Sequence, residues 1–221
     1  MPRTLALLFD LDGTLVDTDH LHVGAYATLL AETGRTLSTD DYRAHVMGAP
    51  NDAIMEYLFP EHPPAAQVAL LERKEELVRA GMGRLTPTPG LLDLLGWAAD
   101  HAVPCGVVTN APRANAAMML AGIGLADRFP VLVIGDELAR GKPDPLPYLT
   151  GLRLLGAEAA RAVAFEDSRS GIRAAVAAGI YTVGLRTALD DAALRAEGAA
   201  TAITDFTDPA LRAMLADMLA K

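Results

Sequence analysis

Two aspartates, Asp10 and Asp12, stand one residue apart directly after the apolar run from Leu5 to Phe9. A run of this length predicts a strand that is buried on both faces. Because a buried strand cannot carry charge into the core, we expect both carboxylates beyond its carboxyl end. In open parallel sheets that end is where ligands bind, although a solvated acidic turn is the alternative. The pair therefore marks a candidate ligand site.

Polar residues also follow a second apolar run, which ends in Thr109 and Asn110. The hydroxyl of Thr109 and the amide of Asn110 can each donate a hydrogen bond to a phosphate oxygen. Backbone amides of the next residues could add further donors. A simple turn after the strand is the alternative interpretation.

A lysine, Lys142, lies in a glycine-containing segment that begins at Gly135. A P-loop is excluded because five residues, not four, separate Gly135 from Gly141, and Pro143 stands where Ser or Thr should bind Mg²⁺. A third apolar run ends in Glu166 and Asp167, just before a predicted helix. An aspartate that caps this helix is the alternative to a functional acid.

The elements that must position these residues fall into two groups. Four helices without an intervening strand are predicted first, over residues 20–32, 42–46, 52–58 and 65–80. Strands then alternate with helices; the strands are predicted at 103–109, 131–134, 161–165, 181–185 and 202–203, and the helices at 91–100, 114–121, 145–155, 170–178, 190–197 and 209–219. This alternation predicts an α/β, Rossmann-like, doubly wound parallel sheet formed by residues 1–16 and 86–221, with residues 17–85 inserted as a helical cap domain.

Composition restricts the class of protein. The chain has 221 residues, of which 51% are hydrophobic and 21% charged, as in a globular protein. The net charge of −9 argues against a nucleic-acid partner, so attraction of a phosphate would depend on a few local cations. The single Cys105 excludes an internal disulfide. We also expect no signal peptide, no membrane span and a cytoplasmic location, while the oligomeric state stays open, with a monomer favoured.

Four segments together resemble the motifs of the haloacid dehalogenase-like superfamily. They are Phe-Asp-Leu-Asp-Gly-Thr-Leu-Val-Asp-Thr (residues 9–18), Thr109, Gly-Lys-Pro-Asp-Pro (residues 141–145) and Glu-Asp-Ser-Arg-Ser-Gly (residues 166–171). Their order, and the helical insertion after the first of them, are similar to the branch that contains β-phosphoglucomutase and phosphoglycolate phosphatase. The resemblance covers essentially the whole chain.

This resemblance implies a Mg²⁺-dependent enzyme that passes through a phospho-aspartate. Asp10 would be the nucleophile, and Asp12 would protonate the leaving oxygen and later deprotonate the attacking water. Lys142 would neutralise the nucleophile and the phosphoryl oxygens, beside phosphate donors from the second motif. Asp10, Asp167 and the main-chain carbonyl of Asp12 would hold Mg²⁺, with Glu166 acting through water.

Within the superfamily, the presence of Asp12 favours phosphoryl transfer over dehalogenation. We expect a phosphatase that acts on a small phosphorylated metabolite, of the sugar-phosphate or phosphoglycolate type. A phosphosugar mutase is the alternative. In its favour, His22 matches a cap histidine of the mutase and is a candidate substrate-binding residue. Against it, Asn51 stands about where the mutase has a cap arginine, and Ala111 and Pro112 replace polar residues that follow the second motif of the mutase. A non-enzymatic phospho-aspartate switch is a further alternative, although such receivers lack the helical insertion.

Overall fold

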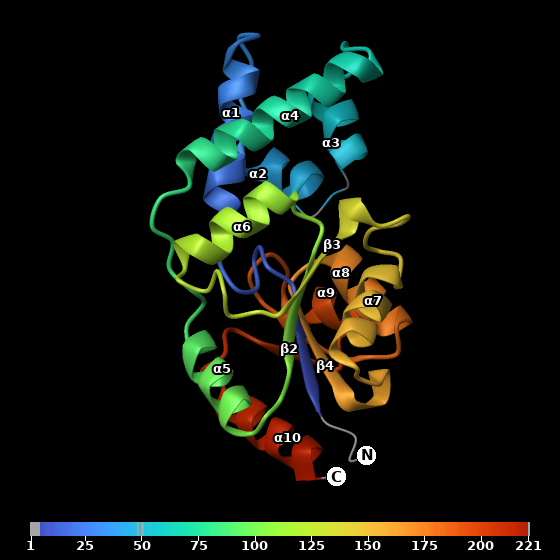
Figure 1. Cartoon of the computed structure of the whole chain (residues 1–221). Coiled ribbons are helices and arrows are strands. Elements are labelled where there is room, and N and C mark those ends of the chain that lie inside the picture. The colour runs from blue at the N-terminus through green and yellow to red at the C-terminus, as the bar shows by residue number, and fades with distance from the viewer. Residues whose placement is uncertain (1–4, 48, 50, 221) are drawn as a thin grey trace. The chain divides into compact units, whose positions relative to one another are not determined.

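The structure is a computed structural model that describes residues 5–47, 49 and 51–220 (Figure 1). The chain divides into two compact units: a core unit of Met1–Asp17 and Leu85–Lys221, and a helical unit of Thr18–Arg84. These bounds lie one residue from those predicted. Residues 1–4 and 221 of the predicted core lie outside the described residues.

The core unit contains a sheet of six parallel strands in the order β3-β2-β1-β4-β5-β6. The strands are β1 (Ala6–Phe9), β2 (Cys105–Thr109), β3 (Val131–Ile134), β4 (Ala162–Glu166), β5 (Tyr181–Leu185) and β6 (Thr201–Ile203). The predicted doubly wound parallel sheet is thereby confirmed. The sequence predicted the strands but not this order, which places the first strand at the centre.

Helices cover both faces of this sheet. They are α5 (Leu91–Asp100), α6 (Arg113–Gly122), α7 (Leu146–Leu155), α8 (Arg169–Ala177), α9 (Asp191–Ala196) and α10 (Pro209–Ala220), with short 3₁₀ turns η2 (Gly135–Glu137) and η3 (Ala159–Arg161). α7 packs on β1, β2 and β3, and α8 packs on β4 and β5. α5 and α10 lie on the opposite side of the sheet (Figure 1).

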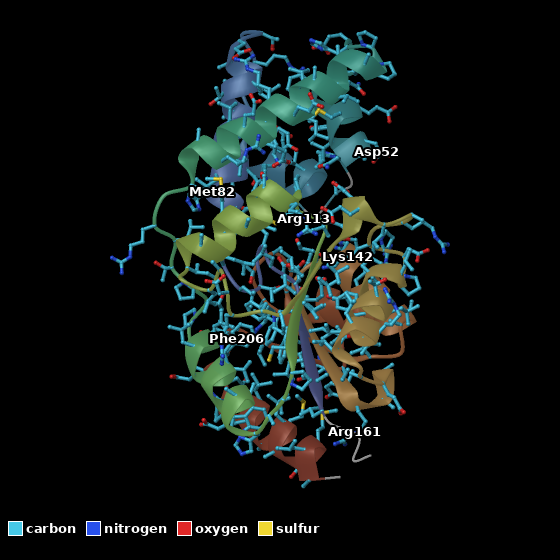
Figure 2. All side chains as sticks on the ribbon, in the orientation of Figure 1. Asp52, Met82, Arg113, Lys142, Arg161 and Phe206 are labelled. Atoms are coloured by element: carbon cyan, nitrogen blue, oxygen red, sulfur yellow. The ribbon has the colours of Figure 1, made fainter. Side chains whose placement is uncertain are left out.

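Side chains that alternate along the strands fill the two layers between sheet and helices. Leu8 and Tyr148, both fully buried, belong to the cluster between the sheet and helices α7 and α8. On the other face, the rings of Phe9 and Phe165 stack with centroids 4.9 Å apart, and Phe206 packs edge-on against both. Figure 2 shows Phe206 on the side of the sheet where α5 lies. This burial keeps the strand ends in fixed positions.

Four strands differ from their predicted extents, and β1 and β6 do so by only one residue at their start. β2 begins at Cys105 rather than at residue 103, since Pro104 has no N–H to donate to the ladder and only its carbonyl is used, by the N–H of Leu7 at 2.9 Å. β4 runs one residue further than predicted and ends at Glu166, whose side chain is fully buried. A charged side chain is tolerated there because several donors surround it, as described below.

The helical unit consists of α1 (Asp19–Ala31), α2 (Thr39–Asp41), η1 (Tyr42–Val46), α3 (Asn51–Leu58) and α4 (Pro64–Gly81). The segment Tyr42–Val46, predicted as an ordinary helix, is a short π-helix. α1 packs along α4, and a cluster that includes Tyr26, Leu29 and Phe59 forms the unit's own core. None of the helices in the described part of the chain combines the length and apolarity that a membrane span needs.

Candidate active site

Three adjacent strands bring the predicted functional residues to one edge of the core unit. Asp10 follows β1, and its N–H donates to the carbonyl of Phe165 at 2.9 Å, which extends the ladder between β1 and β4 by one residue. Thr109 ends β2 and is buried. Glu166 ends β4, and Asp167 comes next. The strand order reverses between β1 and β4, and the crevice at such a point is the usual ligand site of open α/β sheets.

Lys142 links two of these strand ends. Its Nζ donates to Asp10 Oδ1 at 2.7 Å and to Glu166 Oε1 at 2.5 Å, and its side chain is 2% exposed. Figure 2 shows Lys142 at the end of the sheet where the strands finish. These two bonds use two of the three N–H groups of the ammonium, so one donor is left for a substrate oxygen.

The Glu166 carboxylate is held from several directions. Besides Lys142, the hydroxyl of Tyr148 donates to Oε1 at 2.8 Å and that of Ser168 donates to Oε2 at 3.1 Å. Gly171 lets the chain pass close by, since a Cβ there would come within 1.9 Å of the carboxylate. Burial and the neighbouring carboxylates raise the pKa of the Tyr148 hydroxyl well above the usual range, so the group keeps its proton and can donate it to Glu166.

Asp10, Glu166 and Asp167 form a buried acidic cluster, with one ligand oxygen from each lying within 4.8 Å of the others. Burial, and then the charge of Glu166, raise the pKa of Asp10 to about 7 against the pull of Lys142. Burial and the carboxylates of Asp10 and Glu166 raise the pKa of Asp167 well above its usual range. Three carboxylates around one ammonium therefore leave excess negative charge, and hard oxygen donors of this kind fit Mg²⁺.

Asp12 lies in a turn that is fixed by hydrogen bonds to its neighbours. The N–H of Gly13 donates to the carbonyl of Val16 at 2.7 Å, and the hydroxyl of Thr187 donates to the carbonyl of Gly13 at 2.6 Å. Gly13 has φ +81°, and a Cβ there would meet Asp167 Oδ2 at 2.1 Å. This explains why glycine follows Asp12, since no other residue fits both the backbone conformation and the space.

The side chain of Asn110 contacts the main chain of Lys142. Its Nδ2 donates to the Lys142 carbonyl at 3.1 Å, and its Oδ1 accepts from the Lys142 N–H at 3.1 Å. The amide therefore fixes the lysine loop, a role that the sequence did not predict. The Thr109 hydroxyl oxygen accepts from the N–H of Ala111 at 3.0 Å, and its own proton can still be donated. Phosphate binding by Thr109 and Asn110 stays a prediction.

The core unit thus brings together seven of the predicted site residues, which are Asp10, Asp12, Thr109, Asn110, Lys142, Glu166 and Asp167. His22 lies on α1 of the helical unit, and its contribution to substrate binding stays a prediction. Sequence reasoning missed Tyr148, Ser168 and Thr187. Ser168 was visible only as part of the fourth motif, whereas Tyr148 and Thr187 had no local signal.

A family model described as haloacid dehalogenase-like hydrolase matches residues 7–185, a span that includes all four motif segments and the helical insertion. The chain belongs to the haloacid dehalogenase-like hydrolases. Membership of this family confirms the resemblance inferred from the sequence. It also excludes the alternative of a receiver-type switch.

Relatives of this hydrolase are named as phosphatases. It is 33% identical to the validoxylamine A 7′-phosphate phosphatase of Streptomyces hygroscopicus subsp. limoneus, over 85% of this chain and 88% of that protein. It is 31% identical to the phosphorylated carbohydrates phosphatase of Thermotoga maritima, over 90% and 93%. Its fold is similar to that of a CbbY mutant from Rhodobacter sphaeroides crystallised with xylulose-(1,5)bisphosphate, with a TM-score of 0.79, 27% identity and coverage of 93% and 96%.

Proposed function

We propose that this haloacid dehalogenase-like hydrolase is a Mg²⁺-dependent phosphatase that releases phosphate from small phosphorylated metabolites through an aspartyl-phosphate on Asp10. The observation that carries the proposal is the position of the Asp10 carboxylate. It is buried at the carboxyl end of the central strand, 2.7 Å from the Lys142 ammonium and inside the acidic cluster. A carboxylate placed in this way can act as a nucleophile once the surrounding negative charge is offset.

Asp10, Asp167 and the main-chain carbonyl of Asp12 would hold Mg²⁺, with Glu166 oriented toward the same site. When bound, the ion supplies positive charge against the repulsion between nucleophile and substrate. At about 4 Å and an effective dielectric of 20, each pair of like charges costs roughly 4 kcal/mol. Lys142 alone cannot offset three carboxylates and a phosphate dianion, so the residues present fit a divalent cation.

The chain's own residues account for each bond that changes. The Asp10 carboxylate forms a bond to phosphorus while the bond from phosphorus to the leaving oxygen breaks, and the Asp12 carboxyl gives that oxygen a proton. Asp12 then takes a proton from the water that attacks the aspartyl-phosphate, which releases inorganic phosphate and restores Asp10. Lys142 donates to a phosphoryl oxygen throughout, and the Thr109 hydroxyl can donate to another.

The substrate class that we propose is a phosphorylated carbohydrate or a related small phosphate ester. The support comes from the named relatives, two of which are named as phosphatases of validoxylamine A 7′-phosphate and of phosphorylated carbohydrates. A small ester is also consistent with the net charge of −9, because a polyanion would be repelled by the surface as a whole.

The alternative of a phosphosugar mutase is less well supported by the residues after β2. A mutase needs groups that hold the second phosphate of a bisphosphate intermediate, but Ala111 and Pro112 have no polar side chains. Arg113, the next residue, is paired with Glu137: its Nε donates to Oε1 and its Nη2 donates to Oε2, each at 2.6 Å. These observations favour hydrolysis over internal phosphoryl transfer.

A steady-state assay tests the proposal. The purified chain should release phosphate from p-nitrophenyl phosphate over many turnovers with Mg²⁺, and EDTA should stop the release. A panel of sugar phosphates and phosphorylated small acids then ranks substrates by kcat/KM, and glucose 1-phosphate is followed for isomerisation as well as hydrolysis. If no member of the panel is hydrolysed over multiple turnovers, the proposed function is refuted. Isomerisation of glucose 1-phosphate without net phosphate release would favour the mutase.

A further inference from the structure

Tyr148 joins the hydrophobic core to the charged cluster. It lies in the first turn of α7, six residues after Lys142, and is fully buried. Its ring belongs to the apolar cluster that contains Leu8 and Val108, the side chains of β1 and β2 that face α7. Packing of this kind leaves the ring little freedom, so its hydroxyl has a fixed position.

That hydroxyl and that ring both act on charged groups of the site. The hydroxyl donates to Glu166 Oε1 at 2.8 Å, the same oxygen that accepts from Lys142 Nζ at 2.5 Å. The Lys142 ammonium also lies 5.2 Å from the centroid of the Tyr148 ring, within the range of a cation–π contact. One aromatic side chain therefore contacts both the acid that ends β4 and the lysine that reaches Asp10.

Few arrangements could replace these contacts. Glu166 is fully buried, and Ser168 supplies a hydroxyl donor only to its other oxygen, Oε2. Without the tyrosine hydroxyl, Lys142 would be the one side chain in the described structure that donates to Oε1. The carboxylate could then turn toward the ammonium and away from the acidic cluster.

We propose that Tyr148 is a positioning residue, which holds the Glu166 carboxylate and the Lys142 ammonium in the orientation that Mg²⁺ binding and phosphoryl transfer require. The proposal rests on the proposed function but adds a residue to it. The side chain of Tyr148 contacts Glu166 and Lys142, and the proposal gives it no contact with the reacting phosphorus. Its effect passes through Glu166 and Lys142.

The test is Tyr148→Phe in the full-length chain, because phenylalanine keeps the packed ring and removes only the hydroxyl. We expect kcat for p-nitrophenyl phosphate to fall about tenfold with KM changed less than twofold. In the absence of substrate, the dissociation constant for Mg²⁺, measured by calorimetry, should rise at least threefold. Tyr181→Phe, which changes a partly exposed tyrosine at the start of β5, is the matched control and should alter neither quantity.

A merely structural role would lower the melting temperature of Tyr148→Phe and leave both kcat and Mg²⁺ affinity at wild-type values, which would overturn the proposal. A rise in KM alone would also overturn it, since that result would make Tyr148 a substrate contact. If Tyr148→Phe does not fold, Ser168→Ala provides the second test: losing the donor to Oε2 must also weaken Mg²⁺ binding, and an unchanged affinity contradicts the positioning of Glu166. Failure of the proposed function is separable, because it would leave wild type itself inactive.

Discussion

Two clusters of charged side chains in the core unit have opposite balances of charge. At the carboxyl end of the sheet, the carboxylates of Asp10, Glu166 and Asp167 surround one ammonium and are buried. On the helices, the single carboxylate of Glu197 accepts from two arginines, Arg169 at 2.7 Å and Arg173 at 2.5 Å. The arginine side chains are 53% and 59% exposed.

The pKa values follow these balances. Hydrogen bonds from Arg173 and Arg169 lower the pKa of Glu197, as is usual for a carboxylate that is paired with cations. Burial and like charge raise the pKa of Asp10 to about 7 despite its contact with Lys142. The Glu197 carboxylate needs no further partner, whereas the acidic cluster of Asp10, Glu166 and Asp167 has an excess of negative charge that another cation can offset. The difference separates a structural ion pair from a site prepared for chemistry.

The largest expected effect comes from Asp10→Asn, which keeps the shape of the nucleophile and removes its charge. We expect kcat to fall at least a thousandfold, the scale seen when a covalent nucleophile is removed, with the fold intact by circular dichroism. Asp217→Asn, on the exposed face of α10, is the control and should retain wild-type activity. Residual turnover above a tenth of wild type would rule out the covalent route.

Lys142→Met tests the cation that the acidic cluster already has. Removing it leaves three buried carboxylates without their ammonium, and breaking a buried pair in this way costs about 3 kcal/mol of folding free energy. We expect that loss in urea unfolding, together with a fall in kcat of at least a hundredfold. Arg140→Met, in the same loop but with a side chain 70% exposed, should cost less than about 1 kcal/mol. Equal losses for the two variants would show that the buried ammonium of Lys142 stabilises the fold no more than an exposed arginine in the same loop does.

Asp167→Asn tests whether the excess charge binds Mg²⁺. Saturating Mg²⁺ should raise the melting temperature of the wild type, because an ion at 100 times its dissociation constant stabilises the folded state by about 2.7 kcal/mol. In the variant the rise should shrink to less than half at the same Mg²⁺ concentration, since one carboxylate ligand and one charge are gone. A rise equal to that of wild type would place the ion away from this cluster.

The smallest effect is expected for Glu197→Gln, which removes the charge of the carboxylate that is paired with Arg169 and Arg173. The folded-state pKa of Glu197 lies below its ordinary value of 4.5, so its ion pairs stabilise the protein above that pH and lose their contribution as the pH falls below it. Wild type should exceed the variant by at most about 1 kcal/mol at pH 7, and the difference should vanish at low pH. Unfolding curves at both pH values measure it. A difference that grew on acidification would show that the arginines do not lower this pKa.

Much of the fold could be predicted from the sequence because its signals are local. The apolar run before Asp10 predicted β1 to within one residue, and the alternation after residue 90 predicted β3, β5 and α5 with their observed bounds. The meeting of the acids could also be predicted, since Asp10 and Asp167 each follow a strand and carboxyl ends of parallel strands share one edge. Lys142 lies in a loop after β3 and η2, so only its motif pointed to this edge. Backbone exceptions were harder: Tyr42–Val46 is a π-helix, and its sequence does not differ from that of an ordinary short helix in any way that we recognised.

The sequence by itself determined which groups are available: acids after two strands, a lysine in a loop, glycines where the chain must pass close to a carboxylate. Only the tertiary structure decided what each group contacts. It turned the Asn110 amide to the main chain of Lys142, and it placed the Tyr148 hydroxyl on Glu166. The physical reason is that these contacts join strands and helices that are distant in the chain, and their geometry follows from how the core packs, which no local pattern of residues encodes.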